Sequence, residues 1–255
     1  MFHLRDHRYF IGLPVFIAFI WFGSLLAMLL TWLTSGRPKY VSQEGRVAYI
    51  SDVGASFLKP LFVVACCITG FGFFLCLIVE RLLRHTGRLV PEMRKRERVL
   101  GILAVVGAFI AMWGLILLSG FDTLHHTTLH RLFLLLFILG VSLSAIFTVV
   151  EYRWVAQDHP RMHELRRAYI AKAIIAGALI LLAIAFGITL FCAPDIGGVI
   201  EWVIALGFTM YLLTFWYDLR MAKPTQQLAV IREEVTKKGA GELDQRRPMT
   251  SDLEK

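Results

Sequence analysis

The chain has 255 residues, of which 57% are hydrophobic, and its mean hydropathy is +0.63. Soluble domains of this length rarely reach such values, so the composition disfavours a soluble enzyme. The formal net charge is +8, and its distribution along the chain, described below, favours a lipid surface over a nucleic-acid partner.

Six apolar runs are long enough to cross a membrane as helices. They cover residues 9–33, 57–79, 99–119, 132–150, 169–192 and 199–217. A helix needs about 20 apolar residues to span roughly 30 Å of hydrocarbon, and no run shows the period-2 alternation of a barrel strand. The sequence therefore predicts an all-α integral membrane protein: a six-transmembrane-helix bundle in residues 1–221, followed by a tail in 222–255 that is partly amphipathic and then disordered.

Basic residues predict the orientation of this bundle. Six spans place both termini on one side, and 22 of the 27 Lys and Arg residues fall on that side. The other side carries only Arg37, Lys39, Arg46, Lys59 and Arg131. Cytosolic loops of membrane proteins carry an excess of Lys and Arg. We therefore expect both termini and the second and fourth loops to be cytosolic.

The segment 121–130, between the third and fourth spans, combines one carboxylate with three imidazoles, and it faces outward in this topology. Ionisable residues near a membrane are costly and indicate a site. We group it with polar residues of the first loop and the start of the sixth span as a predicted outer polar signature. Its members are Tyr49, Ser51, Asp52, Gly54, Asp122, His126, His130 and Glu201.

One reading of the outer polar signature is a zinc site. If the fourth helix begins near Thr123, then Asp122, His126 and His130 lie four residues apart on one stripe, with His125 to one side. Two histidines at this spacing can bind one zinc ion, with Asp122 or Asp52 as an oxygen ligand. A metal-activated water could then hydrolyse a lipid ester or amide, which makes Asp122, His126 and His130 the catalytic candidates.

Two other interpretations of the outer polar signature involve no catalysis. In the first, the same residues stabilise the bundle: Asp122 or Thr123 caps the fourth helix, Asp52 stabilises a turn with Gly54, and Glu201 pairs with Lys59 or Arg131. In the second, they form a pocket for a lipid headgroup. Neither reading requires a cofactor, so zinc belongs to the enzyme hypothesis alone.

The cytosolic side offers a second candidate site. Arg94, Lys95, Arg96 and Arg98 form the densest basic run of the loops. Such residues orient the spans, and each also contributes about 1 kcal/mol of attraction to anionic inner-leaflet lipid. A transporter is disfavoured because no predicted span carries a charge near its middle or paired broken helices.

Several motifs resemble the FRAG/DRAM membrane family, which is related to the CWH-type N-terminal domain. They are Tyr-Ile-Ser-Asp-x-Gly-Ala at 49–55, Phe-Asp-Thr at 121–123, Leu-His-Arg-Leu-Phe at 129–133 and Glu-Trp at 201–202. The stretches 35–43, 150–154 and 211–221 are similar to its fungal suppressor-of-four-kinase branch. The resemblance carries Tyr49, Ser51, Asp52, Gly54, Asp122, His130 and Glu201 over as a signature.

The resemblance implies six helices with cytosolic termini and, for the fungal branch, a plasma-membrane protein. Such proteins help a phosphatidylinositol 4-kinase complex act at the membrane and influence phospholipid asymmetry. We therefore expect a non-enzymatic regulator of membrane lipid organisation and phosphoinositide signalling. Its expected partners are anionic inner-leaflet phospholipids and a lipid-kinase scaffold. The alternative is a metal-dependent lipid hydrolase or acyl-transfer enzyme, and a secretory-pathway or vacuolar membrane is the alternative location.

Overall fold

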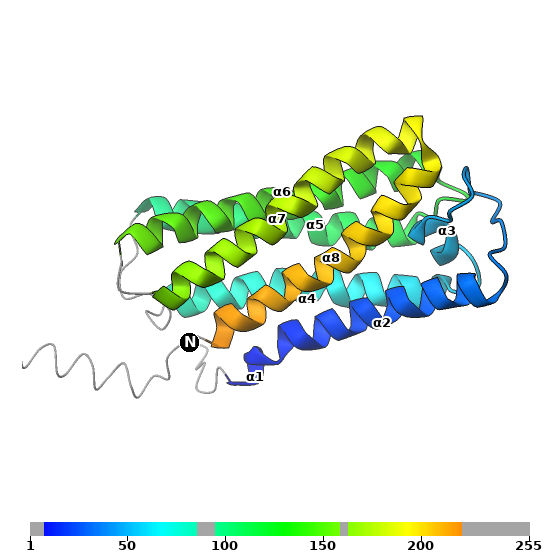
Figure 1. The fold of residues 1–255 in the computed structure, drawn as a ribbon. Helices are drawn as coiled ribbons and strands as arrows, with labels where there is room; N and C mark the ends of the chain where they lie inside the picture. The colour runs from blue at the N-terminus through cyan, green and yellow to red at the C-terminus, as the bar shows by residue number, and fades with distance from the viewer. Residues whose placement is uncertain (1–7, 86–94, 159–162, 221–255) are drawn as a thin grey trace, which may run out of the picture.

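The structure is a computed structural model that describes residues 8–85, 95–158 and 163–220. Figure 1 shows an elongated bundle of long helices with both ends of the described chain at one end. We call this the terminal end, and the opposite end, where the short helix α3 lies, the distal end. Arg94 of the predicted basic patch and the tail 222–255 lie outside the described residues.

The bundle consists of six long helices and two short ones in the described part of the chain. They are α1 (Arg8–Ile11), α2 (Leu13–Thr34), α3 (Ile50–Gly54), α4 (Lys59–His85), α5 (Lys95–Gly120), α6 (Thr127–Asp158), α7 (His163–Cys192) and α8 (Pro194–Arg220). All six long helices are long and apolar enough to cross a membrane. The predicted all-α architecture is confirmed.

The long helices match the six predicted runs but extend beyond them, mostly at the terminal end. The helix α4 continues six residues beyond the predicted boundary at 79, and α6 continues eight beyond 150. These extensions carry charged residues such as Glu80 and Glu151, which a hydropathy criterion places outside the span. The helix continues because its charged side chains find partners inside the bundle, as described below.

Aromatic rings from four helices meet in the core around Phe208 of α8. Its ring centroid lies 5.6 Å from that of Phe73 in α4, 5.8 Å from Phe137 in α6 and 6.2 Å from Trp21 in α2. All three contacts are edge-to-face, the arrangement that the aromatic quadrupole favours. The core therefore ties α8 to the helices on both sides of it.

Glycines allow α5 and α6 to approach closely. A Cβ atom on Gly140 of α6 would lie 2.5 Å from the backbone nitrogen of Ala111, and one on Gly114 of α5 would lie 2.5 Å from that of Phe137. Only a residue without a side chain fits such a contact, which is a common way for helices to pack in a membrane.

Candidate functional site

The distal end is closed by the segment between α2 and α4, which docks onto the beginning of α8. The hydroxyl of Tyr49 donates to the carbonyl of Pro194 at 3.0 Å, and the indole nitrogen of Trp202 donates to the carbonyl of Ala48 at 3.0 Å. The carboxylate of Asp195 accepts the N–H groups of Arg46 and Val47. Residues of α8 thus satisfy several polar groups of this segment.

Glu201 completes this docking. Its Oε2 atom accepts the backbone N–H of Ile50 at 2.6 Å, so the carboxylate holds the first residue of α3. The expected partners were Lys59 and Arg131, but Lys59 pairs with Asp122 at 2.5 Å and Arg131 pairs with Glu44 at 2.6 Å. The structure therefore corrects this pairing, because a backbone donor lies closer to Glu201 than either cation.

Asp52 stabilises α3 from within. Its Oδ2 atom accepts the N–H of Tyr49 at 3.0 Å and its Oδ1 atom accepts the hydroxyl of Ser42 at 2.5 Å. Burial raises the pKa of Asp52 above its usual range, although these two hydrogen bonds oppose the shift. Burial and the nearby Glu201 carboxylate raise the pKa of Tyr49 to about 12. Both groups therefore serve as hydrogen-bonding groups of a folded loop.

Gly54 of the signature is explained by the packing of this loop, whereas Ser51 takes part in it through its backbone. A Cβ atom on Gly54 would lie 2.7 Å from the ring of Phe62, so α3 can pack on α4 only with glycine there. Ser51 contributes its backbone carbonyl, which accepts the N–H of Ala55 at 2.8 Å.

The acid-histidine segment does not form the expected stripe. The helix α6 begins at Thr127, so Asp122 lies before it, contrary to the helix start expected near Thr123. The carboxylate of Asp122 accepts hydrogen bonds from the backbone N–H of His125 at 2.8 Å and from Lys59. The Nδ1 atom of the His125 ring also lies 2.9 Å from this carboxylate. Burial works against ionisation, but these hydrogen bonds hold the pKa of Asp122 well below its usual range.

The two histidines of the zinc hypothesis lie in different environments. His130 is buried, and its Nδ1 atom lies 2.8 Å from the carbonyl oxygen of Leu118 and 3.0 Å from that of Phe121, at the end of α5. His126 is exposed, and its ring packs against Phe121. Within the described residues, no three His, Cys, Asp or Glu side chains are grouped as metal ligands. The zinc hypothesis stays a prediction, and these contacts do not favour it.

The terminal end contains a cluster of buried charges that sequence reasoning missed. Arg81 and Arg84 of α4 both pair with Glu151 of α6, Arg84 at 2.9 Å. Arg84 also pairs with Glu80 at 2.7 Å, and Glu80 accepts the hydroxyl of Tyr152 at 2.6 Å. All five residues are at least 94% buried. Arg153, two residues after Glu151, is exposed, because residues two apart in a helix point about 200° away from each other.

A second ion pair extends the cluster to the last two helices. Lys172 of α7 pairs with Asp218 of α8, and each residue is 1% exposed. The ammonium group also lies 3.7 Å from the ring centroid of Phe215 and 5.5 Å from that of Tyr152. Four helices therefore meet in one network of three cations and three carboxylates. We call it the terminal charge cluster: Glu80, Arg81, Arg84, Glu151, Lys172 and Asp218.

A signal for this cluster was present in the sequence. Lys172 interrupts the apolar run 169–192, while Glu80 and Arg84 stand four residues apart, the spacing that places two side chains on one helix face. Charges within apolar helices face partners in the bundle. The signal was overlooked because each residue lay near the end of a run, where a charge is ordinarily solvated.

The predicted basic patch lies at the same end of the bundle. Lys95, Arg96 and Arg98 are exposed on the first turn of α5, and the guanidinium of Arg96 lies 4.2 Å from the ring centroid of Trp154. Three further basic side chains at the terminal end are exposed: Arg153, Arg167 and Arg220. The acidic side chains described at this end, by contrast, are all buried: Glu80, Glu97, Glu151 and Asp218.

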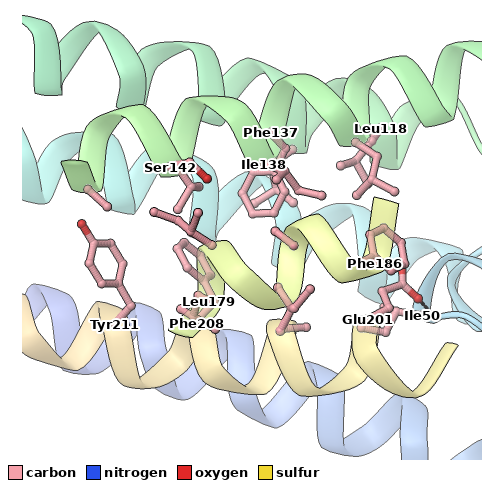
Figure 2. A pocket seen from close by; sticks show the side chains of 18 of the residues that line it. Ile50, Leu118, Phe137, Ile138, Ser142, Leu179, Phe186, Glu201, Phe208 and Tyr211 are labelled. Atoms are coloured by element: carbon pink, nitrogen blue, oxygen red, sulfur yellow. Dashed lines mark hydrogen bonds between the residues drawn. The ribbon is translucent and has the colours of Figure 1, made fainter. Parts of the chain in front are cut away.

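An apolar cavity lies within the bundle, lined mainly by α6, α7 and α8. Figure 2 shows Glu201 and Ile50 at one end of it and Tyr211 at the other. The void measures about 90 Å³. The groove around it is open on one side, and its empty space, including the part open to the surroundings, is about 880 Å³. A single water needs only ~10–15 Å³ measured in this way, so the void exceeds ordinary packing defects.

The comparisons with known proteins agree with this fold. The family model described as the Frag1/DRAM/Sfk1/Cwh43P N-terminal domain matches residues 9–222. The chain belongs to this family. The matched range contains all six long helices and the outer polar signature. The resemblance inferred from the sequence motifs is therefore confirmed.

Two curated fungal relatives match the chain. It is 32% identical to Protein sfk1 of Schizosaccharomyces pombe over 84% of this chain and 65% of the relative. It is 28% identical to Protein SFK1 of Saccharomyces cerevisiae over 58% of this chain and 51% of the relative. The chain thus spans between half and two thirds of these relatives. No solved structure matches it significantly. With its six apolar helices, the chain is a multi-pass integral membrane protein.

Proposed function

We propose that this chain is a non-enzymatic protein of the plasma membrane that regulates lipid organisation and phosphatidylinositol 4-kinase-dependent signalling. Its terminal end faces the cytosol and binds anionic phospholipid and a lipid-kinase scaffold. A secretory or vacuolar membrane is the alternative location. The resemblance to the suppressor-of-four-kinase branch and the similarity to the two fungal relatives support the signalling part of this proposal.

The observation that carries the proposal is the separation of charge at the terminal end. The acidic side chains described there are buried, and those of the terminal charge cluster pair with buried cations. The exposed charges described there are therefore all positive, and Lys95, Arg96 and Arg98 stand together. A basic surface next to a membrane helix is attracted to anionic headgroups by about 1 kcal/mol for each Lys or Arg.

Charge reversal tests this proposal. Replacing Lys95, Arg96 and Arg98 by Glu, together with Arg94, is expected to lower plasma-membrane phosphatidylinositol 4-phosphate and kinase recruitment in cells that lack the native protein. The measurement is quantitative imaging of a phosphoinositide-binding reporter and of the tagged kinase.

The control reverses three exposed basic residues of the distal end, Arg37, Lys39 and Arg46, and is compared with a terminal-end variant that reverses Lys95, Arg96 and Arg98 alone. This control is expected to leave both readouts unchanged. Expression, membrane insertion and topology are verified for each variant. Normal phosphoinositide levels and normal recruitment in the terminal-end variant would contradict the proposal.

A further inference from the structure

The apolar cavity has one polar atom at its distal end that lacks a protein partner. Glu201 lines the cavity and is half-buried, and its Oε2 atom holds Ile50. Its other oxygen, Oε1, accepts no hydrogen bond from the residues that the structure describes. A polar group that faces an apolar space without a partner is unfavourable. The distal end of the cavity is therefore suited to a ligand that brings a hydrogen-bond donor.

Apart from Ser142 and, at the opposite end of the cavity, Tyr211, the remaining lining is hydrocarbon-like. The lining includes Ala176, Leu179 and Ala183 of α7 and Phe137 and Val141 of α6. Small alanine side chains leave the space open, while the larger aliphatic and aromatic groups supply dispersion contacts. Ligand sites in proteins have this composition, a mostly apolar wall with a few placed polar groups.

Two of the helices around the cavity, α6 and α7, are also the least packed of the six long helices. In the most apolar 18-residue stretch of each helix, 11% of the residues are buried in α7 and 22% in α6, compared with 56% in α4. Both helices are among those that span the membrane, so their outer surfaces meet lipid tails. A lipid tail can therefore reach the groove sideways, without crossing water.

We propose that this cavity binds the hydrocarbon tail of a membrane lipid whose polar end is a hydrogen-bond donor, a hydroxyl or an ammonium group, held by Oε1 of Glu201. The inference goes beyond the function proposed above, which concerns anionic lipid at the opposite end of the bundle. It stands even if the link to kinase signalling fails.

Photo-crosslinking of the full chain in phosphatidylcholine nanodiscs tests this inference. Three probes share one 18-carbon tail with a diazirine and differ in the polar end: a primary alcohol, a primary amine or a methyl ester. The alcohol or the amine is expected to label cavity-lining residues of α6, α7 and α8, as located by mass spectrometry. The methyl ester, which has no donor, is expected to label them about tenfold less, since one hydrogen bond is lost.

Comparison of the two donor probes identifies the ligand chemistry. Stronger labelling by the alcohol indicates a hydroxyl-bearing lipid, and stronger labelling by the amine indicates an aminolipid. Either result supports the inference. Equal labelling by the ester and by both donors would overturn the role of Glu201.

Two variants separate the polar contact from the tail site. In Glu201→Gln the amide oxygen can still accept the N–H of Ile50, so that the NH₂ group replaces Oε1 in the cavity. This exchange is expected to weaken labelling by the donor probes and to strengthen labelling by the ester. Ala183→Phe fills the cavity and is expected to reduce labelling by all three probes.

The control for Ala183→Phe is Leu181→Phe on the same helix, since Leu181 is 70% exposed and faces away from the cavity. Size-exclusion chromatography and thermal unfolding establish that each variant is folded, and Ala205→Leu is a second, milder filling of the cavity. Labelling confined to outward-facing residues, or labelling unchanged in both filled variants, would overturn the tail site.

Discussion

At the distal end of the bundle, Glu201 and Asp195 accept hydrogen bonds from backbone N–H groups of the docked segment, whereas at the terminal end Glu80, Glu151 and Asp218 pair with cationic side chains. The first arrangement fixes the path of a loop over the bundle. The second neutralises charges that sit between four helices. The two ends should therefore respond differently to mutation, since an orphaned buried charge costs far more than a lost cap or surface ion pair.

The largest effect is expected from Glu151→Ala, which leaves Arg81 and Arg84 without one of their two carboxylate partners. Removing one partner of a buried ion pair costs about 3–5 kcal/mol. We expect a large drop in the unfolding temperature of the detergent-solubilised protein, measured by tryptophan fluorescence. Arg153→Ala is the neighbouring control and should change it little, because Arg153 is exposed. Similar unfolding temperatures for the two variants would mean that the cluster does not stabilise the bundle.

An intermediate effect is expected from two tyrosines that are both buried in this region. Tyr152 donates its hydroxyl to Glu80, whereas the hydroxyl of Tyr211 has no hydrogen-bond partner in the described structure. Tyr152→Phe should therefore lower the free energy of unfolding by about 1–2 kcal/mol. Tyr211→Phe should leave it unchanged or raise it, since the phenylalanine removes an unsatisfied buried hydroxyl. The opposite ranking in chemical denaturation would contradict these contacts.

The smallest effect is expected at the distal end, from Asp122→Asn. The pair with Lys59 is partly exposed, so its contribution is expected to stay below about 1 kcal/mol. The folded-state pKa of Asp122 lies below the usual aspartate value of 3.8, so ionisation favours the folded state. Its contribution is fully present above pH 3.8 and is lost as pH falls through the folded-state pKa.

Thermal unfolding at a series of pH values measures this contribution. The unfolding temperatures of the native chain and of Asp122→Asn should differ slightly at pH 7 and converge as pH falls below 3.8. Lys59→Met should give a similar, smaller difference. A difference that grows toward low pH would show that Asp122 is not held in its ionised form.

The outer polar signature was found from the sequence, but its arrangement was not. Residue type and topology indicated Asp52, Asp122, His130 and Glu201, which all lie at the distal end. Spacing alone suggested that Asp122, His126 and His130 share one helix face. That expectation depended on the first residue of α6, which is Thr127 in the structure.

The sequence by itself determined the helical architecture, because membrane thickness fixes how long an apolar helix must be and the backbone polar groups must be satisfied within it. Only the tertiary structure decided which polar residues meet. Glu201 binds Ile50, 151 residues away, and Arg84 binds Glu151, 67 residues away. Such contacts, like the cavity between α6, α7 and α8, depend on how whole helices cross. Helix crossing is set by close packing of side chains, which a local pattern of residues does not specify.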